Sequence, residues 1–139
     1  MKDGKLLQGQ CLCGGVTIRL QHDHPTMSAC HCRICRRWSG GPFLTLESHQ
    51  APQMEGAENV RTYSSSDWAE RGFCGTCGTH LFYRLKQGEF YALPAGLFEE
   101  AGHWPFELQV FVDEKPANYA FIQRTREMTG EEVFKAWSP

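Results

Sequence analysis

The sequence lacks the features that mark membrane-spanning, secreted and nucleic-acid-binding proteins. In its 139 residues no apolar run approaches the roughly 18 residues that a helix needs to cross a bilayer. The first five residues, MKDGK, carry charges, and the apolar core of a secretory signal does not follow them. The net charge is −2 without a long basic tract, which argues against nucleic acid as the main partner. We therefore expect a cytoplasmic protein with no membrane segment and no nucleic acid partner.

The sequence also lacks internal repeats and a linker that would separate two domains. A chain of this length is within the usual size of one domain and can bury a hydrophobic core. We therefore expect residues 1–139 to form a single domain. This domain is small enough that a bound metal ion would add appreciably to its stability.

Cysteine is abundant, and its seven residues fall into three groups. The missing secretory signal and the odd count both disfavour a secreted disulfide scaffold. Cytosolic thiols are kept reduced, which favours metal ligation, and the thiolate form of cysteine is a zinc ligand. In chain order the groups are Cys11 with Cys13 as C-x-C, then Cys30, Cys32 and Cys35, then Cys74 with Cys77 as C-x-x-C.

The cysteine count favours two metal sites. Adding either outer pair to the central three would give five thiolates, one more than a tetrahedral zinc ion accepts. The economical partition joins the outer pairs in a closed structural site and leaves the central three as an open site for water or substrate. We therefore predict two zinc ions per chain. The structural ion would bind Cys11, Cys13, Cys74 and Cys77, and the labile catalytic ion would bind Cys30, Cys32 and Cys35.

Five other residues near the cysteines are candidates for ligands or substrate contacts. His31 stands between two predicted ligands, and in an extended chain its side chain would point away from the metal, which favours packing over ligation. His80 follows the last cysteine by three residues and could close the open site as a fourth ligand. The arginines Arg33, Arg36 and Arg37 could offset thiolate charge or bind a substrate carboxylate, and the alternative is plain solvation.

Outside the cysteine groups the sequence predicts short strands joined by turns. Alternating apolar and polar residues, as in VTIRL at 16–20, are typical of a strand with one buried face. The segment 48–59 is polar and contains proline and glycine, so we expect a surface loop. The segment 94–105 resembles a loop, but its apolar residues favour packing on the core. Strands are expected at 16–20, 26–31, 43–47, 60–63, 81–84, 89–93, 106–112 and 119–122, with a helical turn at 32–38 and a short helix at 129–137.

Three sequence blocks contain the cysteines and their flanking glycines. They read GQCLCGGV at 9–16, CHCRICRRWSG at 30–40 and RGFCGTCGT at 71–79. Each block alone is only a zinc motif, but their order and spacing together are highly specific. In the order and spacing of these blocks, the chain resembles the glutathione-dependent formaldehyde-activating enzyme family, which also includes centromere protein V. The resemblance extends over roughly residues 5–122.

This resemblance implies a mainly β fold of the β-tent type, built from layered antiparallel sheets with zinc sites. It implies a structural zinc on the two outer cysteine pairs and a labile catalytic zinc on the central three. The implied activity is that of a carbon–sulfur lyase, the addition of glutathione to formaldehyde that gives S-(hydroxymethyl)glutathione. A small thiol, glutathione, and an aldehyde are therefore the expected partners.

An ion with three thiolate ligands has one exchangeable position, which suggests how such an enzyme would work. A thiol bound there would lose its proton at neutral pH, because coordination lowers its pKa below the usual value of about 8.5. The ion could instead polarise an aldehyde oxygen. Two other classes remain, a zinc-stabilised binding module without catalysis and a thiol redox enzyme of the methionine sulfoxide reductase type. The open site favours the lyase over the binding module, because a structural role needs no vacant position.

Overall fold

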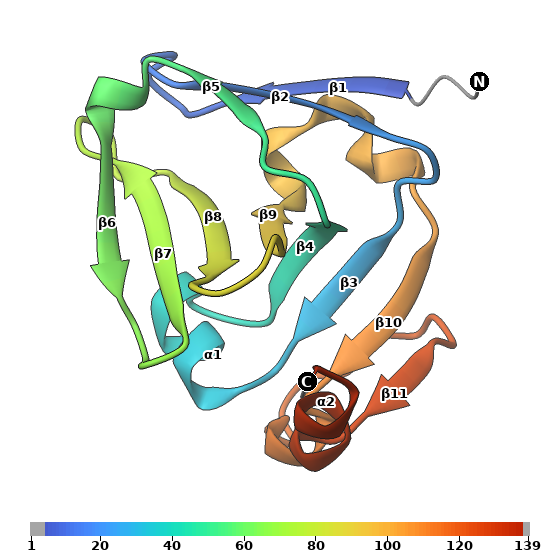
Figure 1. Ribbon diagram of the computed structural model, residues 1–139. Helices are drawn as coiled ribbons and strands as arrows, with labels where there is room; N and C mark the ends of the chain where they lie inside the picture. The colour runs from blue at the N-terminus through green and yellow to red at the C-terminus, as the bar shows by residue number, and fades with distance from the viewer. Residues whose placement is uncertain (1–4, 138–139) are drawn as a thin grey trace.

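Two β-sheets make up most of the protein (Figure 1). The computed structural model describes residues 5–137, so the charged N-terminal residues 1–4 and residues 138–139 lie outside the described part. Figure 1 shows the smaller sheet lying across one end of the larger sheet, which is strongly curved. Within the described part, no helix has the length and apolar character needed to cross a membrane. The layered sheets confirm the predicted mainly β fold.

The smaller sheet contains three antiparallel strands. In spatial order they are β1 (Lys5–Gln10), β2 (Thr17–His22) and β5 (Gln53–Glu55). The strand β5 lies in the segment 48–59, so the prediction of a surface loop there is wrong for these residues. A strand of three residues has too little alternation to be recognised in a sequence. It forms because Met54 lies opposite Ile18 and packs against the core.

The larger sheet contains eight strands and is mainly antiparallel. In spatial order they are β11 (Arg126–Met128), β10 (Phe106–Val110), β3 (Met27–Cys30), β4 (Phe43–Ser48), β9 (Tyr91–Pro94), β8 (His80–Leu85), β7 (Ala69–Cys74) and β6 (Val60–Ser64). The strand β10 runs parallel to both of its neighbours, whereas the other pairs are antiparallel. Sequence periodicity indicates a strand but not its direction relative to its neighbours, which the connections decide.

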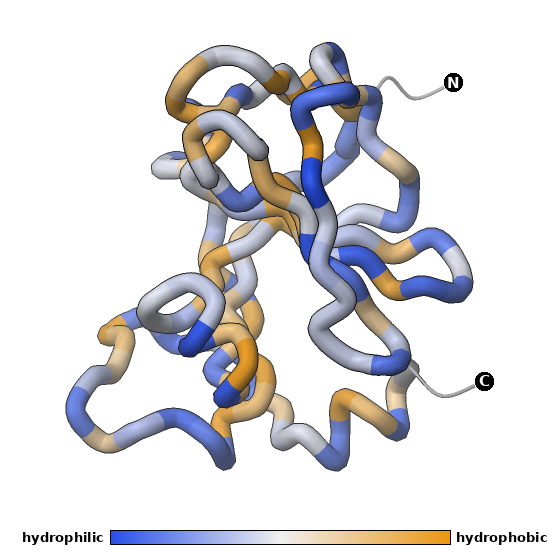
Figure 2. Tube along the Cα trace, turned by 90° about the vertical axis from the view of Figure 1, so that its left-hand side faces the viewer, coloured by the Kyte–Doolittle hydropathy of each residue, from blue (hydrophilic) through white to orange (hydrophobic). Residues whose placement is uncertain are grey.

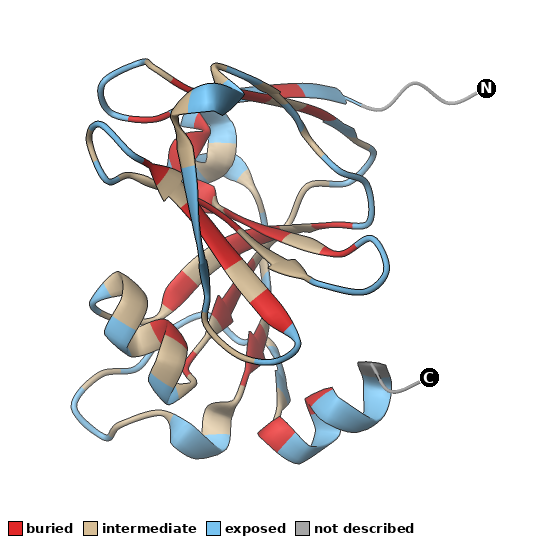
Figure 3. Ribbon diagram, turned by 60° about the vertical axis from the view of Figure 1, so that its left-hand side comes forward, coloured by how far each residue is buried: buried red, intermediate tan, exposed pale blue. Residues whose placement is uncertain are grey.

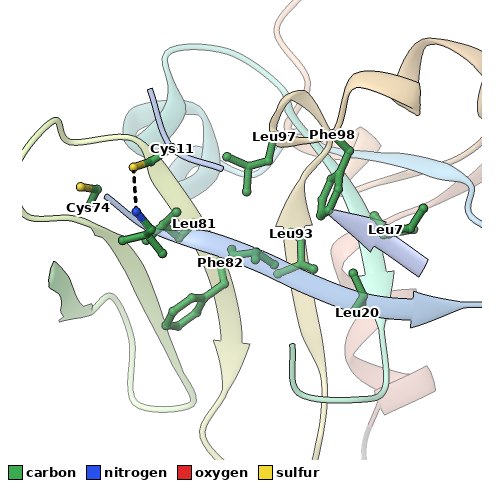
Figure 4. Close-up of a cluster of buried hydrophobic side chains, with 12 residues drawn as sticks. Leu7, Cys11, Leu20, Cys74, Leu81, Phe82, Leu93, Leu97 and Phe98 are labelled. Carbon is green, nitrogen blue, oxygen red and sulfur yellow. Dashed lines mark hydrogen bonds between the residues drawn. The ribbon is translucent and has the colours of Figure 1, made fainter. Parts of the chain in front are cut away.

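Apolar side chains from both sheets pack together in the main core. Burial is concentrated on the strands (Figure 3), and hydrophobic segments run through the middle of the molecule while hydrophilic loops project from it (Figure 2). Leu97 and Phe98 belong to this core, which confirms that the segment 94–105 packs inward. The segment forms two short 3-10 helices, η2 (Ala95–Leu97) and η3 (Glu99–His103). Figure 4 shows Cys11 and Cys74 at one end of the same cluster.

Both predicted helices are present. The helix α1 (Arg33–Ser39) begins after Cys32, whose Sγ accepts from the N–H of Cys35 at 3.3 Å. The helix α2 (Gly130–Trp137) begins with the predicted capping box, in which Thr129 and Glu132 each bond the other's backbone N–H. Two further 3-10 helices are η1 (Ala57–Asn59) and η4 (Val112–Glu114).

The predicted strand at 119–122 is wrong, because these residues have no strand partner. Their alternation has a different cause. Tyr119 and Phe121 cover the ring of His31, whereas Ala120 and Ile122 face solvent. The alternation therefore reflects burial of one side of an irregular segment, and the last strand of the sheet is formed by residues 126–128 instead.

Candidate functional site

Two groups of cysteine sulfur atoms gather in the structure. In each group all sulfur atoms lie within 4.8 Å of one another, close enough for one metal ion. In the described part of the chain, no other histidine, cysteine or carboxylate cluster of this kind occurs. The four-cysteine group contains Cys11, Cys13, Cys74 and Cys77, and the three-cysteine group contains Cys30, Cys32 and Cys35.

The four-cysteine group has the dimensions of a tetrahedral thiolate site. The Sγ atoms of Cys11 and Cys13 are 3.6 Å apart, and those of Cys13 and Cys74 are 3.8 Å apart. A tetrahedron with zinc–sulfur bonds of about 2.3 Å has sulfur atoms about 3.8 Å apart. The donor set and its spacing therefore fit zinc.

Backbone N–H groups point at these sulfur atoms. Val16 donates to Cys11 Sγ at 3.3 Å, an interaction drawn in Figure 4, and Thr76 donates to Cys74 Sγ at 3.4 Å. Gly78 has φ of +80°, so it can turn the chain back immediately after the C-x-x-C pair. These N–H groups stabilise negative charge on sulfur, as a metal-binding thiolate requires.

Thr79 connects the two halves of the four-cysteine group. Its Oγ1 accepts from the N–H of Leu12 at 3.0 Å and lies 3.1 Å from Cys77 Sγ, to which the hydroxyl donates. This hydroxyl is the main reason why the pKa of Cys77 is lowered to about 5. Cys77 is therefore a thiolate at neutral pH, the form that binds metal.

The three-cysteine group is local in sequence. Cys30 ends β3, Cys32 is the N-cap of α1, and Cys35 lies in the first turn of this helix. The turn from strand to helix therefore brings three sulfur atoms together within six residues. Because the end of β3 and the start of α1 are adjacent in the chain, the group needs no distant segment to assemble.

The three thiols favour one thiolate even without a metal ion. Hydrogen bonds from the Cys30 and Cys35 side chains hold the pKa of Cys32 well below its usual value. The bond to Cys32 is also the main cause that raises the pKa of Cys30, which stays protonated. Metal binding at this group would therefore release protons from the other two thiols.

The three-cysteine group forms part of the wall of a cavity of about 930 Å³. Its cysteines all line this cavity, whereas none of the four-cysteine group does. Six aromatic side chains lie in the rest of the wall, together with charged and polar ones. At the surface, Trp68 and Phe134 are each 50% exposed, and their rings meet edge to face with centroids 5.9 Å apart. The aromatic lining residues are Phe43, Trp68, Tyr83, Phe90, Phe111 and Phe134.

Arg71 is the cation beside the three-cysteine group, and sequence reasoning missed it. It lies on β7, is 2% exposed, lines the cavity and donates from Nη2 to Cys35 Sγ at 3.5 Å. One signal could have found it. Ala69 and Phe73, two positions away from Arg71 on either side, are apolar. Because side chains two positions apart on a strand share one face, Arg71 is expected to face inward with them.

His31 does not belong to either cysteine group, in agreement with its predicted packing role. It is fully buried, and Nε2 donates to Gln109 Oε1 while Nδ1 accepts from the Tyr119 hydroxyl, each at 2.8 Å. A neutral ring satisfies both bonds, and burial lowers the pKa of His31. The side chain therefore anchors the segment that carries Cys30 and Cys32 to the strand β10.

The other residues considered as ligands or substrate contacts lie elsewhere. His80 is not part of the three-cysteine group and instead stacks on Trp38 with centroids 4.5 Å apart. Arg36 donates to the carbonyl of His31 at 2.9 Å. Arg33 and Arg37 are exposed, which agrees with plain solvation, although Arg33 lies at the cavity wall.

Comparison with known proteins identifies the family. The sequence profile of the glutathione-dependent formaldehyde-activating enzyme family matches residues 6–114, which include both cysteine groups. The chain belongs to this family. The family resemblance drawn from the three cysteine blocks is thereby confirmed.

Relatives of this family member agree with the assignment. An uncharacterised lyase of Schizosaccharomyces pombe is 38% identical over 130 residues, covering 93% of this chain and 95% of the yeast protein. A Halomonas elongata protein provisionally named a glutathione-dependent formaldehyde-activating enzyme is 34% identical over 86 residues, or 55% of each chain. The family and the yeast relative support a lyase-type enzyme.

A solved structure shares the fold of this family member. The crystal structure of a Rhodobacter sphaeroides protein superposes with a TM-score of 0.58 at 24% identity. The match covers 72% of this chain and 99% of the bacterial chain. The likeness therefore extends over nearly the whole bacterial protein.

Proposed function

We propose that this protein is a zinc-dependent carbon–sulfur lyase that joins a thiol to a small aldehyde, with glutathione and formaldehyde as the pair. The observation that carries the proposal is the placement of the two cysteine groups. The three-cysteine group lines a cavity large enough for a small-molecule thiol, and the four-cysteine group does not. A metal centre that only stabilised the fold would need no cavity and no open coordination position.

In this proposal the chain binds two zinc ions with different roles. Cys11, Cys13, Cys74 and Cys77 would hold the structural ion, and Cys30, Cys32 and Cys35 would hold the catalytic ion. Zinc with three thiolate ligands supplies an exchangeable position at which a thiol loses its proton at neutral pH. Residues 1–139 would act as one domain in the cytoplasm, where the thiols stay reduced.

The residues around the cavity would prepare the thiol and the aldehyde for reaction. The aromatic side chains of the wall would limit the access of water, and fewer water molecules would strengthen polar interactions at the reacting atoms. Trp68 and Phe134 at the surface would shield the bound pair from solvent. In the reaction a sulfur–carbon bond forms, the carbonyl π electrons move to oxygen, and the proton lost by the thiol ends on that oxygen.

The test is the rate of exchange between formaldehyde and glutathione at equilibrium, measured by NMR exchange spectroscopy. Zinc-loaded protein should raise the rate above the uncatalysed background, and the Cys32→Ser variant should return it to that background. Zinc-loaded protein without any acceleration would refute the proposal. Disulfide formation among the central thiols during turnover, found by thiol titration, would instead favour the redox alternative.

A further inference from the structure

Arg71 carries a charge in an unusually buried position. Among the described residues it is the only buried arginine, lysine, aspartate or glutamate. No described carboxylate forms an ion pair with it. Its guanidinium instead lies near the rings of Tyr83, Trp38 and Phe43, at 5.0, 5.8 and 5.9 Å from their centroids. An unpaired buried cation is costly, so its neighbourhood must supply negative charge.

Two of its contacts fix the orientation of the guanidinium. Nε donates to Ser65 Oγ at 3.1 Å, and Nη2 donates to Cys35 Sγ at 3.5 Å. Arginine has five N–H donors, so these two bonds leave three without an assigned acceptor. Nη1 is buried and has no hydrogen-bond partner in the described part of the chain. A buried donor left without a partner costs about 1–3 kcal/mol, and more when it is charged.

The acceptor that suits this group must come from the cavity side, because Arg71, Ser65, Tyr83 and Cys35 all line the cavity. The contact with Cys35 places the guanidinium beside the three-cysteine group. In a thiol–aldehyde adduct, sulfur and oxygen are bonded to the same carbon. In the proposed function the substrate thiol binds at the three-cysteine group. A donor beside the cysteine sulfur atoms is therefore suited to the aldehyde oxygen, which gains negative charge as the substrate sulfur adds.

We propose that Arg71 binds the aldehyde oxygen and stabilises the negative charge that develops on it when the thiol adds. This inference rests on the proposed lyase function and names the oxygen-binding residue of the same site. Arg71 donates hydrogen bonds and keeps its own protons. The sulfur–carbon bond forms, the carbonyl π electrons move to oxygen, and the thiol proton reaches that oxygen to complete the hydroxyl group.

Ser65 is the positioning residue in this arrangement. It lies in the turn between β6 and β7, so its hydroxyl holds Nε from a different segment than α1, which carries Cys35. The Ser65→Ala variant frees Nε and should weaken aldehyde turnover less than the loss of Arg71 itself. Restoring the hydroxyl with Ser65→Thr should recover part of the rate.

The experiment compares Arg71→Met and Arg71→Lys with a matched control, Arg84→Met. Arg84 lies one position from the Tyr83 that faces Arg71, but on the opposite face of β8, where it pairs with Glu70 and does not line the cavity. Zinc content, exchange rates at varied formaldehyde concentration, and formate binding by calorimetry are measured on zinc-loaded proteins. Formate is the probe because its carboxylate presents two oxygens to a guanidinium.

We expect Arg71→Met to keep two zinc ions, to lower kcat by about 10²–10³-fold with little change in KM, and to weaken formate binding at least about tenfold. Arg71→Lys should fall between Arg71→Met and the wild type, and Arg84→Met should match the wild type.

Full activity in Arg71→Met would overturn the proposal while the lyase function stands. Loss of the second zinc ion in both Arg71 variants would also overturn it, because Arg71 would then support the metal site. A third outcome separates the two proposals. If formate binding depends on Arg71 but the wild-type protein shows no exchange activity, the oxygen site is supported and the lyase function is refuted.

Discussion

The two cysteine groups use the same ligand chemistry in opposite structural settings. The four-cysteine group joins segments 61 residues apart, between Cys13 and Cys74, and lies at one end of the main core. The three-cysteine group spans six residues at the start of one helix and lines a cavity. A metal bound between distant segments restricts the unfolded chain strongly, whereas a metal on a local segment restricts it little. The first placement suits stability and the second suits chemistry.

The largest expected effect on stability comes from Cys74→Ser. Cys74 is fully buried, and its loss would open the link between the two distant segments. We expect one zinc ion per chain to be lost and the free energy of unfolding to fall by several kcal/mol, since structural zinc contributes on the order of 10 kcal/mol in small domains. Urea unfolding and zinc analysis of the purified protein would measure both. Unchanged stability would show that the four-cysteine group is not a structural site.

Cys32→Ser should have the opposite profile, a loss of activity with little loss of stability. Serine is a good N-cap, so the hydroxyl can replace Sγ in accepting the N–H of Cys35. We expect the second zinc ion and the exchange activity to be lost, while the free energy of unfolding changes by less than about 1 kcal/mol. A loss of stability equal to that of Cys74→Ser would show that both groups are structural.

Chelator titration should separate the two groups in the unmodified protein. The three-cysteine group offers only three ligands and lines a cavity, whereas four thiolates would close the other site, even though Cys13 there is exposed. A mild chelator should therefore remove one zinc ion first, together with the activity, and leave the circular dichroism spectrum unchanged. Added zinc should restore the exchange rate. Loss of both ions in one step, with unfolding, would contradict the distinction.

The smallest expected effect concerns Glu47, a carboxylate on the cavity wall. Burial raises its pKa, although His49 and Arg126 oppose the shift. The folded state holds the Glu47 proton more tightly than the unfolded state does. The contribution of Glu47 to stability is therefore lost as pH rises through the pKa of the folded state. Glu47→Gln should therefore be more stable than the wild type at neutral pH, and the difference should vanish below about pH 4. Melting temperatures of both proteins between pH 4 and pH 7 would show this. A constant difference across the range would mean that Glu47 is not desolvated.

Several elements could be predicted from the sequence because their causes are local. The capping box at Thr129, the helical turn that follows Cys32 and the alternation along β2 depend on residues a few positions apart. The errors arose where a distant contact decides the conformation. The segment around Met54 forms a strand because Ile18 lies opposite it on β2. Burial alternates along residues 119–122 because Tyr119 covers His31.

The number and spacing of the cysteines alone were sufficient to divide them into groups of four and three, because zinc accepts four ligands and the count leaves one economical partition. Sequence alternation could indicate that Arg71 faces inward, but it could not determine which cysteine group this residue contacts or which group faces a cavity. Arg71 is 36 residues from Cys35 and reaches it only because β7 and α1 meet in the folded chain. Cavities and buried charges arise from contacts between distant segments, which local residue patterns do not encode.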